Sequence, residues 1–482
     1  MRYNNYHKHT HYSNIRTLDC VSKPEDYILR ALELGHTTYF TAEHGYQGNI
    51  YEAQTLCEKH GLKCIYGVEA YYVDDMFDKS SRSMYHIMLV ALTEKARREI
   101  NRIMSIANQD GFYYKPRIDL QSLLSLTPTD TVVTTACIAG RLFKGDDWET
   151  AFLQPVMNHF GSNFFLEVQA HSAQQQILYN MRILKLKEKY NVGLIHANDS
   201  HYIYPEDAKY RDLFLRAKGI YYDDESGFEL DYPDAETILA RYETQGVLSR
   251  EQAIEALENT LVFDQAEGVH VDKEFKIPKI KEELLRKDLH IPNFDYSDDN
   301  QVLKAILARA WRREKGKVRA KRIPEYQDAI YYETDIVEKC GMARYFILDH
   351  LIVKRAVNEY GAVLTRSGRG SAVSFYINHL LGLTEIDRLA APITLYPTRF
   401  MSAERILSSR SLPDIDLNFA SVEPVIQASK DILGEEGIYY MVAYKPLQES
   451  SAFRLWCKAN GYNLEDYDEI AKNLEDHLDD AR

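Results

Sequence analysis

The sequence lacks long hydrophobic runs, paired cysteine motifs and a secretory leader. No apolar stretch approaches the roughly 18 residues of a membrane-spanning helix, so we expect no membrane partner. The start, Met1-Arg2-Tyr3-Asn4-Asn5, has no apolar segment of the kind found in signal peptides. The six cysteines form no Cys-x-x-Cys pair, which favours reduced thiols. Together these absences predict a cytoplasmic protein.

An excess of positive charge is also missing, since the net charge is −14. A chain-wide basic surface for nucleic acid is therefore not expected. A local basic groove is still compatible with this net charge, because carboxylates that hold metal ions also make the net charge more negative. The densest basic stretch covers residues 309–322. It fits either a solvated helix face or a contact with backbone phosphates.

The length of 482 residues and the 45% apolar content suit about three globular domains. The first 200 residues alternate short apolar strands with amphipathic helices, which is typical of a parallel β/α barrel. The predicted strands cover residues 3–9, 37–41, 63–68, 86–92, 131–137, 163–169 and 193–198. Prolines and acidic residues mark a domain boundary near residues 276–296, after which helical patterns dominate.

Potential metal ligands gather where these strands end. The set comprises five His, two Asp, one Glu and one Cys: His7, His9, Asp19, His44, Glu69, His86, Cys137, Asp199 and His201. Functional groups of such barrels lie at the C-terminal ends of strands. His86 is the weakest member, because it falls at the start of its predicted strand.

Nine donors exceed the about four that one zinc ion takes. They predict two or three metal ions, and imidazole with carboxylate favours Zn²⁺, Mn²⁺ or Fe²⁺. Such a centre suits hydrolysis of phosphoesters. Any single His is more often structural, but a chance gathering of this size at strand ends is improbable. Nearby His11, His171 and Glu167 are left outside the set, with His11 as a candidate supporting group.

These residues resemble the PHP (polymerase and histidinol phosphatase) domain. The matching motifs are His7-Lys8-His9-Thr10, Glu43-His44-Gly45, Gly67-Val68-Glu69-Ala70-Tyr71 and Asn198-Asp199-Ser200-His201. Glu43 replaces the usual Asp, while the neighbouring His carries the ligand role. Because all nine matching positions keep ligating side chains, the resemblance implies a metal-loaded site.

A second constellation lies toward the C-terminus. Gly368, Arg369, Gly370 and Ser371 precede an apolar run over residues 372–383 that predicts a helix, an arrangement that favours phosphate binding. Asp414 and Asp416 alternate in an extended segment and would face one side. Each motif alone is weak evidence. Together they fit two-Mg²⁺ nucleotidyl transfer.

Arg399 and Arg405 lie between these two motifs. Either they bind the triphosphate of a nucleotide or they form surface ion pairs. The spacing alone leaves both interpretations open.

The order of these motifs resembles the C family of bacterial replicative polymerases, the family of the DNA polymerase III α subunit. The motifs are Gly368-Arg369-Gly370-Ser371, residues 398–405 and residues 413–419, with residues 111–117 and 345–348 in support. The resemblance implies a PHP domain over residues 1–275, a first palm portion over 276–423 and a partial helical thumb over 424–482. Its divergence suggests a phage version acting in the host cytoplasm.

The resemblance implies template-directed DNA synthesis on a primer–template with deoxynucleoside triphosphates, plus 3′–5′ exonuclease action in the PHP domain. Asn418 replaces a local Asp of the family motif, and Arg366-Ser367 replaces Gly-Pro. The family's third palm Asp and its fingers would follow residue 482. We therefore expect them from a further region or a second polypeptide. Two alternatives remain: a stand-alone phosphoesterase and a non-catalytic, metal-stabilised module.

Overall fold

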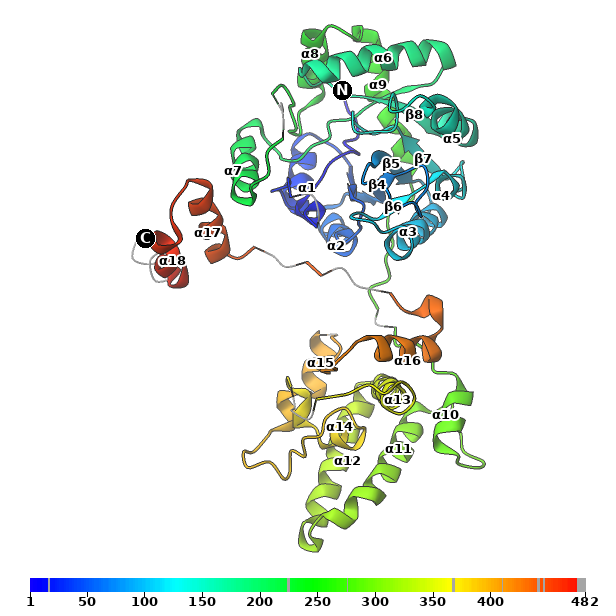
Figure 1. Cartoon of the computed structure of the whole chain (residues 1–482), viewed down its shortest axis with the longest axis vertical. Helices are drawn as coiled ribbons and strands as arrows, with labels where there is room; N and C mark the ends of the chain where they lie inside the picture. The colour runs from blue at the N-terminus through cyan, green and yellow to red at the C-terminus, as the bar shows by residue number, and fades with distance from the viewer. Residues whose placement is uncertain are drawn as a thin grey trace. The chain divides into compact units, whose positions relative to one another are not determined.

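A computed structural model of the chain describes residues 1–15, 18–222, 226–274, 276–365, 369–409, 411–439, 443–444 and 447–474. The chain forms two compact units (Figure 1). Unit 1 contains Met1–Asp272 together with Val442–Arg482, and unit 2 contains Lys273–Met441. No helix of the described residues has the length and hydropathy needed to cross a membrane.

Unit 1 is built on strands covered by helices. Its strands are β1 (Thr38–Phe40), β2 (Glu43–His44), β3 (Lys63–Ile65), β4 (Gly67–Tyr72), β5 (Tyr85–Ala91), β6 (Arg117–Ile118), β7 (Thr131–Thr134), β8 (Phe164–Val168) and β9 (Leu194–His196). Its helices are α1 (Pro24–Glu33), α2 (Ile50–His60), α3 (Glu94–Gln109), α4 (Leu120–Leu124), α5 (Gln154–Phe160), α6 (Gln174–Tyr190), α7 (Ala208–Lys218), α8 (Ala235–Gln245), α9 (Arg250–Asn259), α17 (Glu449–Ala459) and α18 (Leu464–Lys472).

The main sheet has seven strands in the order β2-β4-β5-β7-β8-β9, with β6 beside β4, and β1 pairs separately with β3. The fold is the mixed α/β arrangement expected of a PHP barrel. The all-parallel prediction is wrong at one strand, because β5 runs antiparallel to both β4 and β7. The other pairings between strands of the two sheets are parallel.

The predicted strand over residues 3–9 is wrong as a regular strand. Its only ladder is an isolated parallel bridge between Lys8 and Ser200. Two backbone bonds support the bridge: the His9 N–H donates to the Ser200 carbonyl at 2.8 Å, and the Ser200 N–H donates to the His7 carbonyl at 3.2 Å. This bridge still carries His7 and His9 to the residues that follow β9.

Unit 2 is helical in its described residues. Its helices are α10 (Glu282–Leu289), α11 (Asp299–Glu314), α12 (Ile323–Lys339), α13 (Ala343–Tyr360), α14 (Tyr376–Leu380), α15 (Ala403–Ser409) and α16 (Glu423–Leu433). Its core is apolar and includes Phe346, Phe375 and Phe400. The basic stretch 309–322 is partly neutralised, because Arg309 pairs with Asp288 at 2.6 Å and Lys317 with Glu314 at 2.8 Å.

The predicted helix over residues 372–383 is wrong as a continuous element. A short 3-10 helix over Ala372–Ser374 and the helix α14 are separated by Phe375, whose backbone is extended. This conformation places the Phe375 ring 4.9 Å from that of Phe400 in the core. Packing in the core therefore overrides the helical propensity of the run.

Candidate metal centre and nucleotide site

Glu69, buried in β4, lies at the middle of the predicted metal centre. Its Oε1 atom is 3.1 Å from His7 Nε2 and 2.8 Å from His86 Nδ1. Its Oε2 atom is 2.5 Å from His44 Nδ1 and 3.6 Å from His9 Nε2. One carboxylate thus contacts four imidazoles.

Asp199 joins the same cluster from the loop after β9. Its Oδ1 atom lies 3.3 Å from His7 Nε2, 3.2 Å from His9 Nε2 and 3.8 Å from His201 Nδ1. The backbone of Asp199 has φ +51°, the left-handed region, which aspartate tolerates better than most residues. Two carboxylates therefore contact all five histidines.

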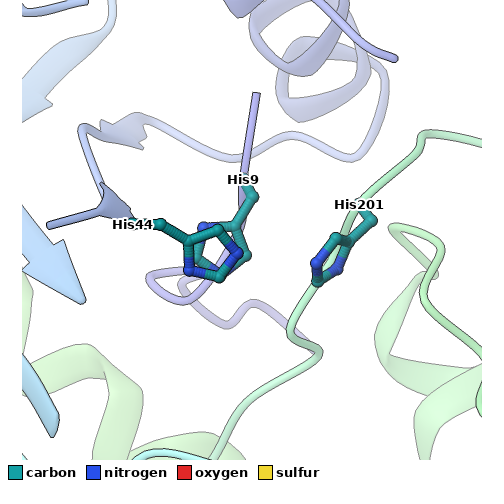
Figure 2. A group of neighbouring side chains, drawn as sticks. All are labelled: His9, His44 and His201. Carbon is teal, nitrogen blue, oxygen red and sulfur yellow. The ribbon is translucent and has the colours of Figure 1, made fainter. Parts of the chain in front are cut away.

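Three histidines from separate segments converge in Figure 2: His9, His44 and His201. Their ligand atoms lie within 4.8 Å of one another. Asp19 joins the cluster through His201, with Oδ2 3.4 Å from His201 Nε2. Cys137 joins it through His86, with Sγ 3.7 Å from His86 Nδ1.

The position of His86 follows from the direction of β5. Because β5 is antiparallel to β4, the first residues of β5 stand beside the last residues of β4, and His86 pairs with Tyr71. The start of this strand thus reaches the edge where the parallel strands end. His86 therefore lies with the other predicted ligands, although it is at the start of its strand.

Electrostatics in the cluster reflect burial competing with opposite charge. Burial opposes charge on His7, yet the carboxylates of Asp199 and Glu167 raise its pKa well above the usual value. Burial, with the neighbouring His44, lowers the pKa of His9 to about 4. Burial opposes charge on Glu69 as well, but His86 and His44 hold its pKa well below the usual range. Glu69 thus stays ionised and His9 neutral, as metal ligands must be, whereas His7 holds a proton that a bound metal ion would have to displace.

Glu167 in β8, which is not in the predicted ligand set, contacts one of the predicted ligands. Its Oε1 atom is 2.9 Å from His7 Nδ1, and its Oε2 accepts from the Tyr6 hydroxyl at 2.7 Å. It orients the His7 ring so that Nε2 faces Glu69 and Asp199. The sequence feature that could have identified Glu167 is its charge within the otherwise apolar segment of β8.

Glu43 supports the site without entering it. Its carboxylate accepts from the Thr10 N–H at 2.9 Å, the Thr10 hydroxyl at 2.7 Å and the Ser13 hydroxyl at 2.5 Å. This ties the segment after His9 to β2, which ends at His44. His171 lies elsewhere, 3.7 Å from Glu229.

The nucleotide motifs meet in unit 2. The Thr365 N–H donates to the Asn418 carbonyl at 2.9 Å, and the Ala420 N–H donates to the Val363 carbonyl at 3.0 Å. Gly370 has φ +67°, and a Cβ built there would overlap the Asp416 carboxylate. Arg369 and Asp416 line the same small pocket. The turn and the carboxylate segment are therefore direct neighbours.

Asp414 and Asp416 are exposed and flank the half-buried Ile415, so they share one side, as their spacing predicts. The segment is extended, but Asp414 and Asp416 form no β-sheet pairing. Backbone pairing with the segment around Thr365 begins at Asn418. Pro413 has no N–H to offer a ladder, and its carbonyl accepts from the Tyr345 hydroxyl at 2.8 Å.

The remaining predicted residues of this site are less engaged. Arg399 and Arg405 are exposed, and the guanidinium of Arg405 donates to the Phe400 carbonyl. Ser371 precedes the 3-10 turn. Gly368 lies outside the described residues.

Two family models match the chain. The PHP domain matches residues 5–171, and the bacterial DNA polymerase III alpha NTPase domain matches residues 302–481. The DNA polymerase III subunit alpha of Aquifex aeolicus is 26% identical over 97% of this chain and 40% of its own length. That of Campylobacter jejuni is 24% identical over 99% of this chain and 41% of its own length.

Among solved structures, a chain described as a metal-dependent phosphoesterase from Bifidobacterium adolescentis is 15% identical, with a TM-score of 0.28. It covers 49% of this chain and 95% of its own length.

The chain carries a PHP domain and a bacterial DNA polymerase III alpha NTPase domain, and nearly its whole length is similar to the N-terminal portion of DNA polymerase III α subunits. It spans about 40% of the length of the curated relatives that it matches.

Proposed function

We propose that the PHP domain binds two or three divalent ions and hydrolyses DNA from the 3′ end. Three buried polar atoms carry the proposal: His44 Nε2 has no hydrogen-bond partner among the described residues, and His9 Nε2 and Asp199 Oδ1, although 3.2 Å apart, do not meet in hydrogen-bond geometry. Burying such atoms without partners costs about 1–3 kcal/mol each. Bound cations would remove that cost, so the donor set fits metal ions.

The nine residues of the set would hold the ions, with Glu69 and Asp199 placed to bridge between imidazoles. Zn²⁺, Mn²⁺ or Fe²⁺ suit this mixture of ligands. Ions bound there would supply Lewis acidity and a reactive water for phosphodiester cleavage. Glu167 holds the His7 ring in place, and Glu43 fixes the segment that carries His9 relative to His44.

For unit 2 we propose a part in template-directed DNA synthesis. Asp414 and Asp416 would hold Mg²⁺, and Arg369, Arg399 and Arg405 would bind the triphosphate of a deoxynucleotide. The contact between Gly370 and Asp416 supports this assignment, because it joins the phosphate-binding turn to the metal-binding carboxylates. The primer–template is the expected macromolecular ligand. Synthesis would draw on the remaining elements of such a polymerase, on this or a second polypeptide.

A labelled-strand assay tests the nuclease proposal. The chain is incubated with a 5′-labelled single strand and Mn²⁺ or Zn²⁺, and the products are resolved by length. We expect stepwise shortening, with Glu69→Gln reducing it at least 100-fold and Asp414→Ala leaving it unchanged. His60→Ala, a change at a half-buried histidine outside the cluster, is the matched control. Shortening that survives in Glu69→Gln would contradict the proposal.

A further inference from the structure

Two loops beside the metal centre are fixed to each other by one buried guanidinium. Arg117, 1% exposed, donates to the carbonyls of Gly111 at 3.0 Å, Asp78 at 2.8 Å and Met76 at 2.7 Å. One loop joins β4 to β5 and the other joins α3 to β6. A guanidinium with three backbone acceptors holds both loops in one arrangement.

Tyr114, in the second loop, has a strained backbone. Its φ is +63°, a region that bulky L-residues rarely adopt. The side chain gains little burial in return, since it is 43% exposed. Strain that core packing does not explain is characteristic of ligand-binding segments.

The surroundings of Tyr114 combine aromatic rings with positive charge. The Tyr113 ring meets it edge-on, with centroids 4.7 Å apart. The guanidinium carbon of Arg82, from the facing loop, lies 4.0 Å from the Tyr114 ring centroid. In the described part of the chain, no carboxylate pairs with the exposed Arg82 within 4.0 Å. Aromatic faces next to cations are the surface that single-stranded nucleic acid prefers.

This loop is also joined to the edge of the metal centre. Lys115 Nζ donates to the Tyr71 hydroxyl at 3.1 Å. The Tyr71 ring lies 5.4 Å from the His86 ring and 6.4 Å from the His44 ring. Gly45 leaves room for this contact, because a Cβ there would lie 2.8 Å from Tyr71 Cε2 and 3.1 Å from Pro116 Cγ.

We infer that Tyr113, Tyr114 and Arg82 form a stacking platform that holds a base of single-stranded DNA beside the PHP metal centre. The inference rests on the proposed nuclease function and adds a substrate preference to it: an unpaired 3′ end, whose bases are free to stack. Asp74, Asp75 and Asp78 belong to the same loop as Arg82. Stacking, more than phosphate pairing, must therefore supply the affinity, and the salt dependence should be shallow.

Binding is measured first, by fluorescence anisotropy with the metal-loaded chain. The probe is a single-stranded ten-thymidine oligonucleotide with phosphorothioate linkages at its 3′ end, which resists cleavage. We expect Tyr114→Ala to weaken binding roughly 10-fold or more, and Tyr114→Phe to retain wild-type affinity. Tyr210→Ala is the matched control, since Tyr210 is 53% exposed and has Lys209 Nζ 4.8 Å from its ring centroid.

Tyr114→Gly is the second variant, because glycine accepts the positive φ without strain. It should unfold at a temperature no lower than the wild type and still bind as weakly as Tyr114→Ala. Affinity equal to wild type in both variants would overturn the inference. Equal wild-type affinity for the single strand and a blunt duplex would also overturn it, because stacking requires unpaired bases.

Hydrolysis of the unmodified oligonucleotide separates the two proposals. If both hold, Tyr114→Ala raises KM and leaves kcat within about twofold. Wild-type binding without any hydrolysis would refute the nuclease function while the platform stands. Hydrolysis with unchanged KM in Tyr114→Ala would refute the platform while the nuclease function stands.

Discussion

The imidazole ring of His9 lies nearly flat on that of His44, with centroids 3.8 Å apart and planes 17° from parallel (Figure 2). Two protonated rings at this separation would repel strongly in a buried site. His9 avoids this, since burial and His44 lower its pKa to about 4. The Nε2 atoms of both rings are buried without a hydrogen-bond partner in the described structure, so both can donate to cations.

Chelation should therefore destabilise unit 1. With ions at a hundred to a thousand times their dissociation constant, binding adds about 3–4 kcal/mol to the free energy of unfolding. Removing the ions leaves only the neighbouring imidazoles to balance the buried charges of Glu69 and Asp199. We expect EDTA to lower the unfolding temperature in calorimetry, and added Zn²⁺ or Mn²⁺ to restore it. Glu69→Gln should show a much smaller EDTA effect; an equal effect would place the stabilising ions elsewhere.

Gly370→Ala tests the contact with Asp416. Alanine at φ +67° costs about 1 kcal/mol of backbone strain, and its Cβ would also displace the Asp416 carboxylate. Gly382→Ala is the matched control: φ is +77°, and nothing lies within 4 Å of the added Cβ. Both variants should lose similar stability. Only Gly370→Ala should weaken Mg²⁺-dependent binding of a deoxynucleoside triphosphate, by about 10-fold in calorimetric titration.

Asp349, in α13, should make unit 2 less stable as pH rises. Burial raises the pKa of its carboxyl to about 7, and Oδ2 has no described hydrogen-bond partner. The folded state therefore holds a proton that the unfolded state has lost above about pH 4. By linkage the free energy of unfolding falls between about pH 4 and 7, by an amount on the order of 4 kcal/mol.

Asp349→Asn should remove this pH dependence and raise the unfolding temperature at pH 8. Denaturant unfolding at pH 5 and pH 8 measures the difference. The exposed Asp328→Asn is the control. A wild-type free energy of unfolding that rises from pH 5 to pH 8, unchanged in Asp349→Asn, would contradict the prediction.

Relief of the strain at Tyr114 should stabilise the protein. Tyr114→Gly removes a left-handed conformation that costs an L-residue about 1–2 kcal/mol, offset by the greater freedom of glycine in the unfolded chain. We expect a net gain of about 0.5–1 kcal/mol by urea unfolding. Asn191→Gly, at φ +53°, should gain less, because asparagine tolerates this conformation. A loss of stability in Tyr114→Gly would mean that the ring contributes more than the backbone costs.

Much of the cluster of histidines and carboxylates is predictable, because strand ends in an α/β barrel converge and candidate ligands can be read from strand positions. The position of His86 depends on the direction of β5, which the alternation of strands and helices predicts to be parallel. A usable signal was present: residues 73–84 contain no helical pattern, and parallel neighbours require a crossover, usually helical. The orienting role of Glu167 depends on its contact with His7, which lies 160 positions away in sequence.

The candidate nucleotide site is less predictable than the cluster of histidines and carboxylates. The spacing of Asp414 and Asp416 correctly predicts a shared side. The apolar run after Ser371 predicts one helix, but Phe375 takes an extended backbone to reach Phe400. Long-range packing of this kind leaves no trace in local periodicity. The division at residues 275 and 423 stays a prediction, while contacts divide the described chain at Asp272 and Met441.

The return of the chain to unit 1 affects how the PHP domain can be isolated. Helix α17 packs on α7, and the Tyr444 ring lies 4.7 Å from that of Tyr12 and against Gly48. A protein cut after residue 272 would expose these surfaces near His9 and His44 to water. Joining residue 272 to residue 443 through a short glycine-serine linker would instead keep both halves of the unit in one molecule. Unit 2 is therefore inserted between two segments of unit 1, and its coding sequence can be deleted without losing either segment.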